Sequence, residues 1–309
     1  MKKIEIIIPV YNEFEVIDEL FNKLNEIKLL EYKNTSISIT IVDDGSSNDF
    51  VTKLKKLKQS NEFKLIEIAK NSGQQIALRA GLNHSSSDAV IFMDADLQDP
   101  PELICNMIDS WLEGFDVVHT VRTKRQKESF LKKITANLFY KIANKHSDYE
   151  LTKNSGDFKL IDQKIIKKIK ENTDGELYLR GAIDFYSTQP NFISYERQPR
   201  FAGDRKYKYS QSFNLAMSGL VSFSNFLPNF LIRSLLVFGL FFSVVFIYFI
   251  SSLQNFDYLE RGWASIIGLL LFTNFVQLVS FLFIGVYLKK IFNQTSGRDM
   301  YFIKEITEE

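Results

Sequence analysis

Apolar residues in the first two thirds of the chain form short continuous runs, separated by stretches with a helical spacing. The runs are rich in isoleucine and valine, which predicts buried strands at residues 4–10, 37–42, 64–69, 89–93 and 117–121. Between them, apolar positions recur every three or four residues, as at 15–29 and 48–58, which predicts helices. Strands that alternate with helices build a mostly parallel sheet covered on both faces. We therefore expect an α/β domain over residues 1–208.

Each of the first four predicted strands ends in a segment with polar residues. These segments are 9–13, 42–46, 71–75 and 94–101. In an open α/β sheet, ligands gather at the carboxyl ends of the strands. The last segment suits a hard divalent cation and a phosphorylated substrate because it clusters carboxylates, reading Asp94-Ala95-Asp96-Leu97-Gln98-Asp99-Pro100-Pro101. This cluster alone is compatible with a kinase, a phosphatase or a transferase.

The last third of the chain contains two long apolar runs without a charged residue. Residues 234–252 and 264–288 form runs of about 19 and about 25 residues, each long enough to cross a hydrocarbon core of roughly 30 Å as a helix. The alternative is a pair of buried core helices in a soluble protein. We expect two transmembrane helices over 231–290 with a short outer loop, followed by a C-terminal tail at 291–309.

The charges that flank these runs predict their orientation. Arg233 precedes the first run, and Lys289 and Lys290 follow the second. The connection between the runs carries two acidic residues and one basic residue, Asp257, Glu260 and Arg261. By the positive-inside rule, the N-terminal domain and both chain ends are expected on the cytoplasmic side of the inner membrane.

The segment before the first run has the pattern of a membrane-surface helix. Apolar residues between 212 and 227 fall on one helical face, so we expect an amphipathic juxtamembrane helix at 209–230 that lies in the membrane interface or packs on the domain. Just upstream is a basic run that would attract an anionic leaflet, although such runs are often only solvated: Arg197, Arg200, Arg205, Lys206 and Lys208.

Composition bears on whether the protein binds nucleic acid and whether it can form a disulfide. The chain has 309 residues and a net charge of +1, so no global field favours nucleic acid, and we expect none as a partner. Its one cysteine, Cys105, cannot form an internal disulfide.

Five ordered motifs together with the paired apolar runs resemble one enzyme family across nearly the whole chain. The motifs are 9–13, 42–46, 94–101, 155–158 and 197–207. They resemble the polyprenyl-phosphate glycosyltransferases of glycosyltransferase family 2, in particular the bacterial bactoprenol glucosyltransferases, which are related to dolichyl-phosphate mannose synthase. The resemblance implies a GT-A (Rossmann-like) domain with an interfacial helix and two C-terminal transmembrane helices. It also implies assembly as a homotetramer.

The resemblance assigns the donor half of the site. It implies Mg²⁺ or Mn²⁺ held by Asp96 and Gln98, with Asp94 orienting a UDP-sugar. The nucleotide would lie against Pro9, Tyr11, Glu13, Asp43 and Asp44. Apart from the resemblance, Gly73 would allow a ligand to approach the backbone closely, although its segment 71–75 could instead be a tight turn that opens a helix. Asp99 is expected only to start the next helix, because Asp-Pro-Pro is a helix-opening sequence.

The acceptor half would be formed by Asp157 and the basic run. Asp157 could be a general base, but a lipid phosphate is mostly dianionic at neutral pH, so a positioning role or a capped turn are the alternatives. Lys206, Arg200 and Arg205 would bind the acceptor phosphate. The chain departs from the family pattern with Arg205 where serine is usual and Val286 where relatives often carry glutamate.

The reaction implied by the resemblance is an inverting, metal-dependent transfer of a sugar from a UDP-sugar to undecaprenyl phosphate at the membrane. Glucose is the expected sugar, and the product would serve cell-surface glycan modification such as that of lipopolysaccharide O-antigen. The alternatives are another donor (GDP-mannose, UDP-N-acetylglucosamine or an aminosugar nucleotide), a processive polysaccharide synthase, and a non-enzymatic membrane scaffold.

Overall fold

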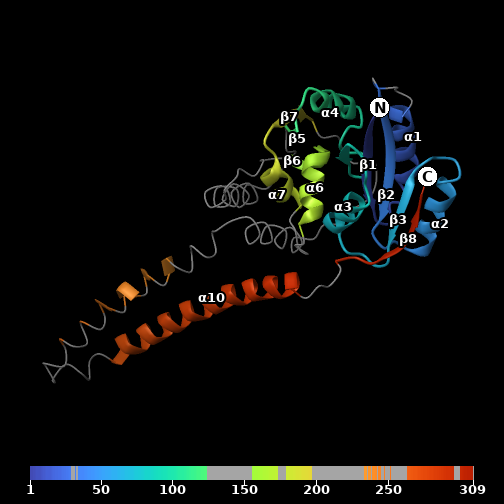
Figure 1. Ribbon diagram of the computed structural model, residues 1–309. Helices are drawn as coiled ribbons and strands as arrows, with labels where there is room; N and C mark the ends of the chain where they lie inside the picture. The colour runs from blue at the N-terminus through green and yellow to red at the C-terminus, as the bar shows by residue number, and fades with distance from the viewer. Residues whose placement is uncertain are drawn as a thin grey trace.

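A mixed sheet with helices on both faces forms the body of the protein (Figure 1). The computed structural model describes residues 1–28, 32, 34–123, 155–172, 179–196, 263–295 and 300–308, and single helical residues between 233 and 251. The strands are β1 (Lys2–Val10), β2 (Thr35–Asp43), β3 (Lys64–Ile68), β4 (Ala89–Phe92), β5 (Val117–Arg122), β6 (Ser155–Asp162), β7 (Pro190–Tyr195) and β8 (Ile303–Thr307). The helices are α1 (Ile17–Lys28), α2 (Asn48–Leu57), α3 (Gln74–Asn83), α4 (Leu103–Leu112), α6 (Gln163–Glu171), α7 (Leu179–Tyr186) and α10 (Trp263–Thr295).

The strand directions bring the end of β6 that begins at Ser155 to the edge where the first four strands finish. The order across the sheet is β7-β5-β6-β4-β1-β2-β3-β8. The four strands β1 to β4 run parallel, whereas β6 is antiparallel to β4 and β8 is antiparallel to β3. The start of β6 therefore lies beside the carboxyl ends of β1 to β4, and we call this side of the sheet the carboxyl edge.

Alternating side chains on each strand fill two separate cores. Ile6 and Ile8 of β1 pack with the helices α1, α2 and α4, whereas Ile7 packs with α3, α6 and α7. Strands buried on both faces are expected to read as continuous apolar runs, which is why they could be predicted from sequence. The five predicted strands and the two predicted helices are confirmed, with ends that shift by at most a few residues.

β7 and β8 were not predicted from the sequence. In β7 the exposure alternates along the strand, and β8 is charged at Lys304 and Glu305, so neither has a continuous apolar run. We expected only a tail at 291–309, but α10 continues to Thr295 and β8 then joins the exposed edge of β3.

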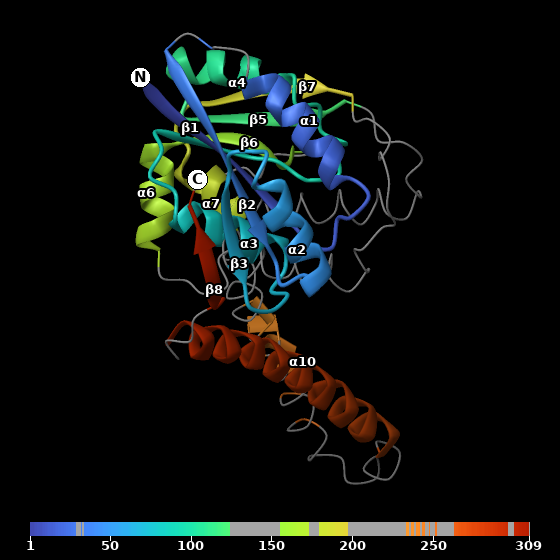
Figure 2. The ribbon, with the colours of Figure 1, turned by 90° about the vertical axis from the view of Figure 1, so that its right-hand side faces the viewer.

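In the part of the chain that the structure describes, one helix is long and apolar enough to cross a membrane. It is the segment Gly268–Leu288 of α10, with a mean hydropathy of 2.1. Figures 1 and 2 show α10 projecting away from the layered domain. Most of the first expected span lies outside the described residues, as do the juxtamembrane helix at 209–230 and the basic run after Glu196. Phe241 from the first apolar run contacts Phe272 of α10, with ring centroids 5.8 Å apart.

Candidate active site

The loops after β1 and β2 are joined by hydrogen bonds at the carboxyl edge. The Asn12 backbone N–H donates to Ser46 Oγ at 2.9 Å, and Asn12 Oδ1 accepts from the Ser47 N–H at 3.0 Å. Asn12 has a positive φ of 51°, a conformation that costs free energy and often occurs at functional sites. Of the predicted nucleotide ligands in the first loop, Tyr11 is exposed, while Pro9 and Glu13 are half-buried.

The backbone turn at Gly45 allows only glycine. Gly45 has φ +70°, and a Cβ atom there would lie 2.4 Å from the Lys70 carbonyl carbon. This turn therefore passes very close to the loop that follows β3. Asp44 ties the two loops together, because its carboxylate accepts the Ser72 N–H at 2.7 Å and the Gly73 N–H at 2.8 Å.

Asp43 and Asp44, both predicted nucleotide ligands, are buried at the end of β2. Burial raises the pKa of each carboxyl group. Hydrogen bonds oppose this shift, from the Ser46 side chain and backbone at Asp43 and from backbone N–H groups at Asp44. Asp43 Oδ2 accepts the Ser46 N–H at 3.2 Å, whereas Asp43 Oδ1 has no hydrogen-bond partner among the described residues. Asp44 holds the loop of Gly73 in place, and Asp43 keeps an acceptor atom for a further donor.

The expected metal ligands share a tight turn after β4. Asp96 Oδ1 accepts the Gln98 N–H at 3.2 Å, and Leu97 between them has a positive φ of 54°. Asp94 comes directly before this turn. Burial, and then the carboxylates of Asp157, Asp99 and Asp96, raise the pKa of Asp94 to about 8. The turn therefore carries a dense group of carboxylates.

Asp157 is brought next to Asp94 by the antiparallel pairing of β6 with β4. Burial opposes its ionisation, but the Arg180 guanidinium holds the pKa of Asp157 low, at about 2. Arg180 Nε and Nη2 donate to the two oxygens of Asp157 at 2.6 Å and 2.7 Å. The capped-turn interpretation of Asp157 is wrong, because this residue lies within β6 and its carboxylate binds an arginine.

Asp99 does not simply begin a helix, as we had expected. The residue before α4 is Glu102, and no side-chain hydrogen bond caps that helix. The Asp99 carboxylate is buried, and it accepts the Tyr195 hydroxyl and, at 3.5 Å, Arg122 Nη2. A buried carboxylate needs such donors, so this contact ties the turn after β4 to β5 and β7. Gly156 makes room for it, since a Cβ there would lie 2.7 Å from Arg122 Nη2.

Two polar residues near the site received no role from the sequence, although Gln74 lies in the predicted polar segment 71–75. Gln74 follows the assigned Gly73, and its Nε2 donates to Asp94 Oδ1 at 2.6 Å and to Asp157 Oδ2 at 3.1 Å. Arg180 belongs to α7, a helix that we did not predict. The only signal for Arg180 was its spacing of four residues from Asp184 on an amphipathic helix.

A cluster of buried titratable side chains lies next to Asp157 along β6. Lys159 and His119 are buried and face Asp184, at 4.0 Å and 3.6 Å from its Oδ1. Burial and the nearby Lys159 lower the pKa of His119 to about 2, so this imidazole stays neutral. The ring stacks on Phe192 with centroids 5.3 Å apart.

The predicted acceptor-phosphate ligands Arg200, Arg205 and Lys206 lie outside the described residues. Val286, the other departure from the family pattern, lies on α10 and is half-buried. The roles of all these residues stay predictions.

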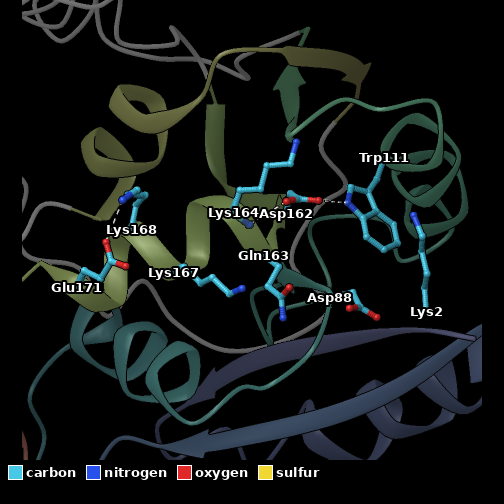
Figure 3. Close-up of a pocket in the computed structure, with 9 residues that line it drawn as sticks. All are labelled: Lys2, Asp88, Trp111, Asp162, Gln163, Lys164, Lys167, Lys168 and Glu171. Carbon is cyan, nitrogen blue, oxygen red and sulfur yellow. Dashed lines mark hydrogen bonds and ion pairs between the residues drawn. The ribbon is translucent and has the colours of Figure 1, made fainter.

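A pocket of about 530 Å³ lies at the opposite end of the strands (Figure 3). It is lined by Lys2 of β1, Trp111 of α4, Asp162 at the end of β6, and residues of α6. Asp162 accepts the Trp111 indole N–H at 2.7 Å and the Lys164 backbone N–H at 2.8 Å. Since this pocket is remote from the carboxyl edge, it is distinct from the candidate site.

The donor set at the carboxyl edge fits a divalent cation. Among the described residues no three acidic, His or Cys side chains form a ready-made metal cage. Mg²⁺ and Mn²⁺ do not need one in such sites, because one or two protein oxygens together with substrate phosphates suffice. Besides burial, the carboxylates of Asp157, Asp99 and Asp96 raise the pKa of Asp94, and a bound cation would offset the repulsion among them.

The mixed sheet and its carboxylate-lined edge define a GT-A-like α/β domain. A sequence profile described as glycosyl transferase family 2 matches residues 5–170. The chain belongs to this family and is a glycosyltransferase.

Relatives match the chain over nearly its full length. It is 34% identical to the SfII prophage-derived bactoprenol glucosyl transferase of Shigella flexneri, covering 98% of each chain. An uncharacterized glycosyltransferase of Synechocystis is 33% identical over 98% of this chain and 95% of the relative. The solved structure of glucosyl-3-phosphoglycerate synthase from Mycobacterium tuberculosis with Mn²⁺, UDP-glucose and phosphoglyceric acid has a TM-score of 0.47 at 14% identity, covering 72% of this chain and 79% of that one. That likeness is too distant to carry a functional argument.

Proposed function

We propose that the protein transfers glucose from UDP-glucose to undecaprenyl phosphate at the cytoplasmic face of the membrane, giving undecaprenyl-phosphate-glucose and UDP. The observation that carries this proposal is the 34% identity, over 98% of both chains, to a relative named as a bactoprenol glucosyl transferase. The match includes the C-terminal third, where a lipid acceptor would be met. The product would serve modification of cell-surface glycans such as lipopolysaccharide O-antigen.

The nucleotide is proposed to bind at the ends of β1 and β2. Asp43 Oδ1 is a buried acceptor with no hydrogen-bond partner among the described residues, which supports a contact with an N–H or O–H group of the nucleoside. Tyr11 is exposed beside it and can contact the base or ribose, with Pro9 and Glu13 on the same loop. Asp44 and Gly73 shape the loop that borders the diphosphate.

Asp96 and Gln98 are the proposed ligands of the divalent cation, in the turn that follows β4. Bound there with the diphosphate, Mg²⁺ or Mn²⁺ would stabilise the negative charge that develops on the departing UDP. Asp94 would orient the sugar, and Gln74 in turn fixes Asp94.

The reaction requires no protein group to remove a proton from the acceptor. A lipid phosphate is mostly dianionic at neutral pH, so its oxygen can attack the anomeric carbon directly. One carbon–oxygen bond forms as the bond to UDP breaks, and a single displacement inverts the configuration. Asp157, whose oxygens are held by Arg180, suits a positioning role.

The position of the carboxyl edge supports a lipid acceptor. Ile303 of β8 pairs with Ile68, the last residue of β3, and it follows the end of α10 at Thr295 by eight residues. A fully extended chain of that length spans at most about 28 Å. The carboxyl edge is thus near the end of α10 that the flanking charges place in the cytoplasm.

We propose that the apolar runs form two transmembrane helices preceded by the interfacial helix. Large apolar side chains of α10 are exposed, for example Leu278 and Leu282, and the contact of Phe241 with Phe272 supports side-by-side packing. The basic residues Arg200, Arg205 and Lys206 would bind the acceptor phosphate just before the interfacial helix. Assembly as a homotetramer is proposed by resemblance.

The test is a donor panel with the full-length protein in detergent. UDP-glucose, UDP-N-acetylglucosamine and GDP-mannose are each incubated with undecaprenyl phosphate and Mg²⁺ or Mn²⁺, and the lipid product is read by mass spectrometry. We expect a single hexose addition from UDP-glucose, loss of product with chelator, and loss in Asp96→Ala. Glu171→Gln, an exposed acidic residue at the opposite pocket, is the matched control and should remain active.

Each other outcome contradicts a part of the proposal. Transfer from another donor alone would correct the sugar, and a product with many sugars would indicate a processive synthase. Full activity of Asp96→Ala would exclude the proposed metal site. Absence of any lipid-linked product would overturn the acceptor assignment.

A further inference from the structure

The Asp157 carboxylate is saturated with hydrogen-bond donors. Its Oδ1 accepts Arg180 Nε at 2.6 Å and Gln75 Nε2 at 3.1 Å. Its Oδ2 accepts Arg180 Nη2 at 2.7 Å and Gln74 Nε2 at 3.1 Å. A carboxylate offers about four lone-pair sites, so four donors leave no site for a proton taken from a substrate. In this arrangement Asp157 is an anchor for its neighbours.

Gln74 connects Asp157 to the donor side of the site through hydrogen bonds. Its amide nitrogen carries two hydrogens, and the two acceptors of that nitrogen are Asp157 Oδ2 and Asp94 Oδ1, the latter at 2.6 Å. A continuous hydrogen-bonded chain therefore runs from Arg180 on α7, through Asp157 on β6 and Gln74 on α3, to Asp94 after β4.

We propose that Arg180 is a positioning residue of the glycosyl transfer, acting through Asp157 and Gln74 to orient Asp94. The proposal rests on the proposed function in one respect, which is that Asp94 faces the sugar. It assigns Asp157 the role of an anchor and not of a general base, and it adds Gln74 and Arg180 to the site.

The geometry explains why arginine is needed on α7. Its planar guanidinium donates two parallel N–H bonds and fixes both the place and the rotation of a carboxylate, which the single ammonium of lysine cannot do. The Asp157 side chain is 5% exposed, so its charge has little access to water. The other charged groups around it are Asp94 after β4, Lys159 on β6 and Asp184 on α7.

The test is a double-mutant cycle on the full-length protein with Arg180→Gln, Asp157→Asn and both together. We expect Arg180→Gln to lower kcat by roughly 10- to 100-fold, because two charge-assisted hydrogen bonds are lost. The KM for UDP-glucose should change by less than about threefold, because the residues proposed to bind the nucleotide are untouched. The double variant should lose no more activity than Asp157→Asn alone, and Arg180→Lys should recover only part of kcat.

The matched control is Arg79→Gln, which removes an arginine that is more deeply buried than Arg180. Arg79 lies on α3 and donates to the Asn172 carbonyl at 2.6 Å, away from the carboxylates. This variant should melt at a lower temperature while its kcat stays near the wild-type value. The two variants are compared at equal melting temperature. If Arg180→Gln loses more kcat than Arg79→Gln, the loss comes from positioning and not from lower stability.

The outcomes separate this inference from the proposed function. If the wild type transfers sugar and the two losses simply multiply, or Arg180→Gln keeps full kcat, the positioning role is wrong while the function stands. If the wild type transfers no sugar, the function is wrong. In that case the melting temperatures of the wild type, the two single variants and the double variant test whether Arg180 and Asp157 are coupled. If the two single losses in melting temperature add up in the double variant, the two residues act independently and the inference is wrong.

Discussion

Side chains of the same type acquire opposite properties at the carboxyl edge. Asp94 and Asp157 are both partly or fully buried, but the pKa of Asp94 is raised to about 8 by burial and by neighbouring carboxylates, while Arg180 holds that of Asp157 at about 2. The difference arises from which donors surround each oxygen. Asp94 and Asp96 could be found from sequence because they follow a predicted strand, and Asp157 because its motif at 155–158 resembles that of the family.

Their partners could not be found in that way. Arg180 and Gln74 are separated by more than 100 residues in the chain, and both contact Asp157, which the pairing of β6 with β4 places beside Asp94. No local pattern in the sequence encodes that contact. The same reason explains the wrong expectation for Asp99, whose partners Arg122 and Tyr195 belong to β5 and β7.

Because His119 is neutral in the folded protein, we predict that the free energy of unfolding depends on pH. Its pKa is about 2 in the folded protein and about 6.5 when unfolded, so below pH 6.5 only the unfolded state gains a proton and stability falls as pH falls. His119→Gln removes this titration. The advantage of the wild type in unfolding free energy should therefore shrink by about 1.4 kcal/mol for each pH unit below 6.5.

Thermal unfolding of both proteins in detergent between pH 7 and pH 5 measures this difference. The nearby groups Lys159, Asp184 and Asp116 are present in both proteins, so they largely cancel in the comparison. A constant gap between the two proteins would show that His119 is protonated in the folded state.

At the level of elements, a strand was predictable when both of its faces are buried. β1 to β4 are central and have continuous apolar runs, whereas β7 and β8 are the two edge strands of the sheet and alternate or carry charge. Charged edge strands resist pairing with other molecules. Because the same charges interrupt the apolar run, such strands cannot be predicted from hydropathy.

Lys55 on α2 connects β8 to the sheet. Its Nζ lies 2.8 Å from Glu67 Oε1 and 2.7 Å from Glu305 Oε2, and Glu67 is buried in β3. Lys55→Gln should lower the free energy of unfolding by roughly 2 kcal/mol, because among the described residues the remaining cation paired with this buried carboxylate is Lys304, at 4.0 Å.

Melting temperatures of this variant and of two further variants test the expectation. Glu305→Gln removes only an exposed partner and should have a small effect, while Lys55→Met combined with Glu67→Met should recover most of the loss. An equal loss in Glu305→Gln and Lys55→Gln would show that the contact with β8, and not the buried carboxylate, dominates.

At the scale of the whole molecule, α10 is the element on which the proposed membrane location depends. Leu278 and Leu282 are each 67% exposed on this helix, which favours contact with lipid. The wild type should stay with membranes after alkaline carbonate extraction. Replacing both leucines with lysine should release much of the protein, since each charge near a helix centre costs about 2.5–3.5 kcal/mol of insertion.

The pair Leu278→Ala and Leu282→Ala is the control and should remain in the membrane fraction. Complete extraction of the wild type by carbonate would indicate a peripheral protein and contradict the spanning role of α10.

The return of the chain to β8 has a mechanical consequence. The domain joins the apolar segments covalently at two places, once after Glu196 and again between Thr295 and Ile303. A body attached through one linker can turn about the membrane normal and tip away from the bilayer. Two attachments on the same sheet oppose both motions. If α10 spans the bilayer as proposed, the carboxyl edge would therefore keep one orientation relative to the membrane and to the proposed lipid acceptor, which diffuses in two dimensions.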